Sequence, residues 1–114
     1  MITLDKLNQF GANTKEGLDR CMNNEAFYLR LVDKAINDDS FIKLKNELEN
    51  KNLDNAFQIS HSLKGVFGNL SITPIYEIVY ELTEELRERK DIDYKDYIEK
   101  LLEKREELIK LINE

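Results

Sequence analysis

Apolar residues recur at helical spacing along almost the whole chain. The clearest stripe covers residues 53–70, where apolar side chains fall three and four positions apart: Leu53, Ala56, Ile59, Leu63, Val66, Phe67 and Leu70. Comparable stripes cover residues 24–36, 41–48, 75–86 and 94–112. This period predicts amphipathic helices, and no stretch shows the alternation that is typical of a strand.

Capping residues delimit these helices. Thr3 is a predicted N-cap and Gly11 a predicted end for a short opening helix, and Thr14 is a predicted N-cap for a second one. The second helix is expected to carry one apolar face, formed by Leu18, Cys21 and Met22. The long helices are expected to start near Asn24, Ser40, Leu53, Thr73-Pro74 and Asp93. The break at residues 38–40 is compatible with a kink between two parts of one antiparallel hairpin.

Long amphipathic helices joined by short turns pack most simply as an antiparallel bundle. We therefore expect an all-α fold, an antiparallel up-down four-helix bundle with short N-terminal helices covering one end. The 114 residues suffice for one domain with its own core. Within this single domain, 1–114, the short helices are expected at about residues 1–22 and the bundle at about residues 24–114.

Composition narrows the function classes. Charged residues make up 35% of the chain and the formal net charge is −6, which argues against a nucleic-acid partner. No stretch approaches the roughly 20 apolar residues that span a bilayer, and no basic N-terminal region precedes an apolar one. Cys21 is the only cysteine, so an internal disulfide is impossible and a reducing compartment fits. We expect a cytoplasmic monomer that binds neither nucleic acid nor a membrane.

The segment HSLKGVFGNL, residues 61–70, holds the only histidine and two of the four glycines. At about 100° per residue, His61 lies about 160–180° around the predicted helix from Leu63 and Leu70. The imidazole is therefore predicted to face solvent. Lys64 lies one turn further along the same side.

This arrangement suits phosphoryl transfer. An exposed neutral imidazole is a nucleophile that can carry a phosphoryl group, although an ordinary surface histidine is the alternative for His61. Lys64 would offset the charge of the phosphoryl oxygens. An interior glycine costs roughly 1 kcal/mol of helix stability. We therefore interpret Gly65 and Gly68 as leaving space for a phosphoryl group and a partner, with close packing of a neighbouring helix as the alternative.

Phe57 and Gln58, which precede the histidine in the chain, extend the candidate surface. Phe57 lies within about 40° of His61 around the helix and away from the apolar stripe. It is expected to belong to a docking surface or, equally, to be partly buried against a neighbouring helix. Gln58 is expected to form a polar contact at the rim of this surface.

The motif His61-x-x-Lys64-Gly65, followed by Gly68-Asn69-Leu70, resembles the signature of histidine-containing phosphotransfer (Hpt) domains of bacterial two-component phosphorelays. The similarity extends to residues 17–20, 23–25 and 27–29 upstream, and to Ile75, Ile78, Val79 and Leu82 downstream. The resemblance implies the same four-helix bundle and the function of a phosphocarrier in a multistep phosphorelay.

By this resemblance, His61 accepts a phosphoryl group from the aspartyl phosphate of a receiver domain and passes it to another receiver. The implied partners are response-regulator receiver domains and a hybrid sensor histidine kinase, and Mg²⁺ is expected from the receiver. No cofactor or metal is expected on this chain, because one histidine cannot build a di-metal bundle site. No nucleotide loop or kinase motif is present, so we expect a stoichiometric carrier and not an ATP-dependent enzyme.

Two alternatives stay open at this point. The chain could instead be a helical docking module that binds a receiver or a kinase without carrying phosphate. It could also be part of a larger hybrid sensor kinase, although Met1 favours a free-standing protein.

Two positions depart from the family pattern. Similar Hpt domains often orient the imidazole with a Glu or Gln from the following helix, but a gap-free transfer of that position falls on Thr83. Either Thr83 orients the ring, directly or through water, or this contact is absent. Glu84 is adjacent but points about 100° away. Ser71 replaces the usual glycine, which affects the loop more than the chemistry.

Overall fold

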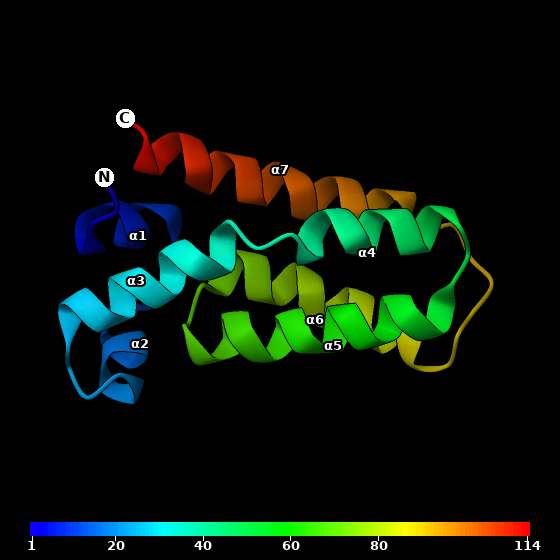
Figure 1. Cartoon of the computed structure of the whole chain (residues 1–114), viewed down its shortest axis with the longest axis horizontal. Helices are drawn as coiled ribbons and strands as arrows, with labels where there is room; N and C mark the ends of the chain where they lie inside the picture. The colour runs from blue at the N-terminus through cyan, green and yellow to red at the C-terminus, as the bar shows by residue number, and fades with distance from the viewer.

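The computed structural model describes residues 1–114 and contains seven α-helices. They are α1 (Leu4–Phe10), α2 (Thr14–Arg20), α3 (Glu25–Ile36), α4 (Ser40–Glu49), α5 (Leu53–Asn69), α6 (Thr73–Arg87) and α7 (Lys95–Ile112). Helices α3 and α4 follow one another roughly end to end, and α5, α6 and α7 run back and forth beside them (Figure 1). Helices α1 and α2 lie at the end of the bundle where α3 begins (Figure 1). The predicted all-α up-down bundle with short helices at one end is confirmed.

Side chains fix several helix ends where the sequence indicated. The Thr3 hydroxyl accepts a hydrogen bond from the Lys6 backbone N–H, and the Asn24 side chain accepts one from the Phe27 N–H. Gly11 ends α1 in the left-handed conformation with φ of 111°, which glycine adopts without strain.

Two predicted caps are each displaced by one residue, from Thr14 to Asn13 and from Ser40 to Asp39. The N-cap of α2 is Asn13, whose side chain accepts a hydrogen bond from the Glu16 N–H, and Thr14 is already helical. Ser40 is the first residue of α4, and its N–H donates to the carboxylate of Asp38 (2.8 Å). Hydrogen bonds from the Ser40 side chain and backbone hold the pKa of Asp38 below its ordinary value. Several residues that can cap a helix follow one another at each start, and spacing alone does not show which one precedes the first helical residue.

One hydrophobic core of 22 buried residues extends from Leu7 in α1 to Leu108 in α7. Tyr28, Phe41 and Phe67 are among its largest fully buried side chains. The rings of Phe41 and Phe67 meet edge-on, with their centroids 5.6 Å apart, and so join α4 to α5. Because the core takes side chains from α1 as well as from the bundle, the short helices and the bundle pack as one unit.

The segment from α2 to α3 holds the end of α5. The buried Tyr28 hydroxyl donates a hydrogen bond to the Leu70 carbonyl (2.7 Å). Gly17 makes room for this ring, because a Cβ at that position would lie 2.5 Å from it. Met22, predicted on the apolar face of α2, is instead 85% exposed, because α2 ends at Arg20 and Met22 adopts a φ of 56°.

Replacing Tyr28 with phenylalanine tests this contact. Burial and, to a lesser extent, the neighbouring Cys21 raise the pKa of Tyr28 from 10.0 to about 12. A group with a raised pKa in the folded state stabilises the protein below its unfolded pKa, and this contribution is lost as the pH rises through the folded pKa. We expect Tyr28→Phe to lower the free energy of unfolding at neutral pH by about 1 kcal/mol.

The same variant should show a shallower loss of stability than the wild type between pH 10 and 12, because the phenol that titrates there is gone. Urea unfolding followed by circular dichroism at several pH values measures both effects. An unchanged pH profile would contradict the buried phenol.

Candidate functional site

Helix α5 carries the only histidine and packs most closely against the antiparallel helix α6 (Figure 1). Inside their interface the hydroxyl oxygens of Ser60 and Thr83, both fully buried, lie 2.6 Å apart. Thr83 donates its single proton to the Val79 carbonyl (2.7 Å), so Ser60 is the donor to Thr83. This pair fixes the register of α5 and α6 one residue before His61 and Glu84.

The histidine faces solvent, as its angular position predicted. His61 is exposed on α5, and its ring centroid lies 5.7 Å from that of Phe57. Phe57 is half-buried, and the guanidinium carbons of Arg87 and Arg89 lie 5.4 and 4.3 Å from its ring centroid. Arg89 also donates to the carboxylate of Asp54 (2.7 Å). The half-buried ring fits the alternative of partial burial against a neighbouring helix, and a role of Phe57 in docking stays a prediction.

Lys64 is half-buried on the histidine side of α5 and lies against α6. Its Nζ atom is 5.5 Å from the ring centroid of Tyr80, which is 45% exposed. The Tyr76 ring, one turn earlier on α6, lies 6.0 Å from the Tyr80 ring. Two aromatic side chains of α6 therefore flank the lysine that is one turn from His61.

The two glycines of α5 have different surroundings. A Cβ built on Gly65 meets nothing within 4 Å, so Gly65 leaves open space beside Lys64, as predicted. A Cβ at Gly68 would lie 2.9 Å from the Tyr76 ring, so the packing alternative applies to Gly68 and the prediction of open access is corrected there. Both glycines lie on the histidine side of α5. Their surroundings differ because Tyr76 of α6 lies over Gly68 and no side chain lies over Gly65.

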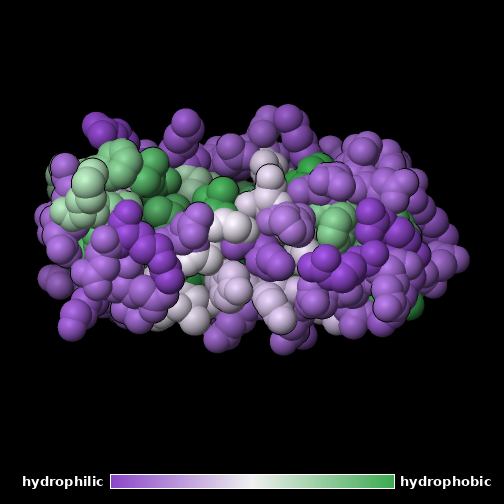
Figure 2. All heavy atoms as spheres, turned by 90° about the horizontal axis from the view of Figure 1, so that it is seen from below, coloured by the Kyte–Doolittle hydropathy of each residue, from purple (hydrophilic) through white to green (hydrophobic).

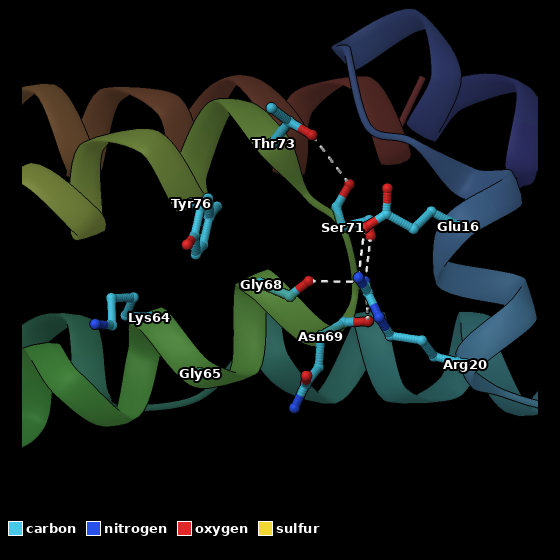
Figure 3. A pocket seen from close by; sticks show the side chains of 9 residues that line it. All are labelled: Glu16, Arg20, Lys64, Gly65, Gly68, Asn69, Ser71, Thr73 and Tyr76. Carbon is cyan, nitrogen blue, oxygen red and sulfur yellow. Dashed lines mark hydrogen bonds and ion pairs between the residues drawn. The ribbon is translucent and has the colours of Figure 1, made fainter.

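A polar groove of about 490 Å³ continues from Lys64 towards α2 (Figure 3). It is lined by Glu16, Arg20, Lys64, Gly65, Gly68, Asn69, Ser71, Thr73 and Tyr76. At the end away from Lys64, Arg20 donates to the carbonyls of Gly68 (3.0 Å) and Asn69 (3.2 Å) and to the Ser71 hydroxyl (2.7 Å) (Figure 3). The last carbonyls of a helix have no partner within it, and although the Gly68 carbonyl also accepts from the Ser71 N–H (3.1 Å), Arg20 adds a cap to the C-terminal end of α5. This role could not be predicted from the sequence, because it joins residues far apart in the chain.

Thr83 does not orient the imidazole, so of the two alternatives left open for this position the contact from Thr83 is absent. Its side chain is fully buried and its hydroxyl is engaged by the Val79 carbonyl and by Ser60. The gap-free transfer from the family pattern fails because the helix register pairs Thr83 with Ser60 and not with His61.

Glu84, which was expected to point about 100° away from the position of Thr83, is an acidic neighbour of the histidine. Its exposed carboxylate accepts hydrogen bonds from Arg87 Nε (3.1 Å) and Nη2 (2.8 Å). The Arg87 hydrogen bond is the main cause that lowers the pKa of Glu84, and the charges of Lys64 and His61 lower it further. Helix α6 therefore presents a carboxylate on the histidine side of α5. The offset of about 100° was estimated along α6 alone, and it does not show where α5 lies relative to α6.

The rest of the surface adds little chemistry. Gln58, predicted at the rim, is exposed. No group of three or more His, Cys, Asp or Glu side chains is placed to hold a metal ion, and no helix is both long and apolar enough to cross a membrane. Figure 2 shows a face that is hydrophilic over one end, paler across its middle, and more hydrophobic towards the end that carries α2 and the start of α3.

Comparison with protein-family models matches residues 37–113 to the Hpt domain, a range that includes α4, α5, α6 and α7. The chain belongs to the Hpt domain family. Hpt domains are phosphocarriers that act in histidine phosphotransfer with receiver domains and kinases of phosphorelays. The match leaves out the upstream similarity noted at residues 17–29. Comparisons with curated proteins and with solved structures found no match.

Alanine at the two glycines should separate their roles in this Hpt domain. Gly65→Ala is expected to raise the free energy of unfolding by about 1 kcal/mol, because alanine favours the helix and its methyl group meets nothing. Gly68→Ala should be less stable than Gly65→Ala by about 1 kcal/mol or more, because its methyl group displaces the Tyr76 ring. Thermal unfolding followed by circular dichroism measures both variants. Equal stability would contradict the close contact between Gly68 and Tyr76.

Proposed function

We propose that this Hpt domain carries a phosphoryl group on His61 between the receiver domains of a phosphorelay. The proposal is carried by one observation: an exposed imidazole on α5, within the segment matched to the family, with Lys64 one turn away and open space at Gly65. An exposed ring can be reached by an aspartyl phosphate on a partner, and a bare surface beside it lets that partner approach closely.

In the proposed step, His61 Nε2 attacks the phosphorus atom of an aspartyl phosphate on the receiver. The N–P bond forms as the P–O bond to the aspartate breaks, and the carboxylate leaves with the electron pair. The imidazole enters the reaction neutral with its proton on Nδ1, and any proton released from Nδ1 goes to solvent because the ring is exposed. The reverse reaction passes the group on, with the carboxylate of the next receiver as nucleophile and the imidazole as leaving group.

Lys64 and Gly65 would support this transfer in different ways. The Lys64 ammonium offsets the negative charge that is spread over the phosphoryl oxygens in the transition state. Gly65 leaves room for those oxygens, because a side chain there would occupy the space beside the ring. Mg²⁺ would be supplied by the receiver, where the aspartyl phosphate forms.

The other parts of the proposal concern the setting of the reaction. The chain would act as a monomeric, stoichiometric carrier in the cytoplasm, with receiver domains and a hybrid sensor histidine kinase as partners. It would have no ATP-dependent kinase activity of its own, since its sequence contains no glycine-rich nucleotide loop and no kinase motif.

Replacing the histidine tests the phosphoacceptor. After mixing with a receiver domain charged by acetyl phosphate, the wild type should gain one phosphoryl group by intact mass, and acid should remove it. His61→Gln should gain none while its circular dichroism spectrum stays unchanged, because the side chain is exposed. Acceptance by His61→Gln would show that the site is elsewhere. A folded wild type that gains no label from a panel of receivers would favour a docking module that carries no phosphate.

Replacing the lysine tests the charge. Lys64→Ala should slow transfer about ten- to a hundred-fold without abolishing it, which corresponds to the loss of one charge-assisted contact. Lys100→Ala, at an exposed lysine of α7, is the matched control and should transfer at the wild-type rate. The measurement is the initial rate of transfer from the charged receiver, and equal rates for both variants would exclude Lys64 from the site.

A further inference from the structure

We propose that Tyr80 is a positioning residue for Lys64, and that its ring holds the ammonium group on the histidine side of α5 before a phosphoryl group arrives. This inference rests on the proposed function of His61 and Lys64. Tyr80 belongs to α6 and lies outside the histidine motif in the sequence. In the proposed step it does not touch the phosphoryl group.

The first observation is the contact itself. Lys64 Nζ lies 5.5 Å from the centroid of the Tyr80 ring, within the range in which a cation is attracted to the face of an aromatic ring. None of the salt bridges in the molecule involves Lys64. The contact with Tyr80 therefore restrains the ammonium group while leaving its charge unpaired.

The second observation is that Tyr80 is itself supported. Its ring lies 6.0 Å from that of Tyr76, and Tyr76 packs on the bare backbone of Gly68. A side chain at Gly68 would push Tyr76 away, since a Cβ there would lie 2.9 Å from the ring. The second glycine of the histidine motif thus supports the tyrosine pair, and the pair supports the lysine.

The third step is physical. A lysine side chain has many rotamers, and ordering it around an anion costs conformational entropy. A contact that already restricts the chain leaves less entropy to be lost at the moment of transfer. A carboxylate partner would order Lys64 as well, but it would also neutralise the charge that the phosphoryl oxygens need. An exposed cation–π contact is weak enough for the ammonium to move to those oxygens.

Transfer rates test whether the ring acts through the lysine. Tyr80→Leu should slow transfer to His61 about two- to five-fold, and Tyr80→Phe should restore the wild-type rate because it keeps the aromatic ring. In a Lys64→Ala background, Tyr80→Leu should cause no further loss. Tyr97→Leu, at a half-buried tyrosine of α7, is the matched control for loss of a ring. Equal slowing by Tyr80→Leu in both backgrounds would overturn the proposal, because the ring would then act without Lys64.

Proton NMR tests the contact without any transfer. The side-chain methylene protons of Lys64 should be shifted upfield by the ring in the wild type and in Tyr80→Phe, and should return to ordinary values in Tyr80→Leu. If the wild type accepts no phosphoryl group, the proposed function fails. If the wild type accepts it but the upfield shift is absent, or Tyr80→Leu transfers at the wild-type rate, the positioning role alone fails.

Discussion

The packing of α5 on α6 is the constraint on which the candidate site depends. At its centre, two buried hydroxyl groups satisfy one another only when Ser60 lies opposite Thr83. A different register would take the acceptor away from the Ser60 hydroxyl, while Thr83 would keep its bond to the Val79 carbonyl, and an unsatisfied buried polar group costs about 1–3 kcal/mol. The same register determines which α6 side chains meet Lys64 and Gly68 at the surface. The buried contact between Ser60 and Thr83 therefore helps to determine which side chains lie around Lys64 and Gly68 at the surface.

The histidine lies among aromatic rings and cationic side chains, both unpaired and ion-paired, on an acidic protein. On the surface of α5 and α6, Lys64 follows the histidine by one turn, and the two arginines that cover Phe57 lie near the ring beside it. The chain as a whole carries a formal net charge of −6. Glu84 pairs with Arg87 and Asp54 pairs with Arg89, whereas Lys64 belongs to no ion pair, so the Lys64 ammonium is the charge near His61 that can attract an anionic group. An aspartyl phosphate on a partner is an anionic group of this kind.

Most of the fold and the centre of the site could be predicted from the sequence, because both depend on the spacing of residues along single helices. Helical periodicity marked the bundle helices, and the angle between His61 and the apolar stripe showed which way the ring points. The features of the site that were missed all involve two helices at once. Arg20 capping α5, Tyr76 packing on Gly68 and Thr83 pairing with Ser60 depend on helix register, which a pattern along one helix does not contain.

The hydrogen bonds from the N-terminal segment to the end of α5 affect where the boundaries of this domain are placed. The family match begins at residue 37, but Arg20 and Tyr28 lie before that point and bind the backbone at the end of the histidine helix. A fragment cut at the family boundary would keep His61 and lose both of these contacts. In this protein the unit that folds around the histidine is larger than the unit that defines the family.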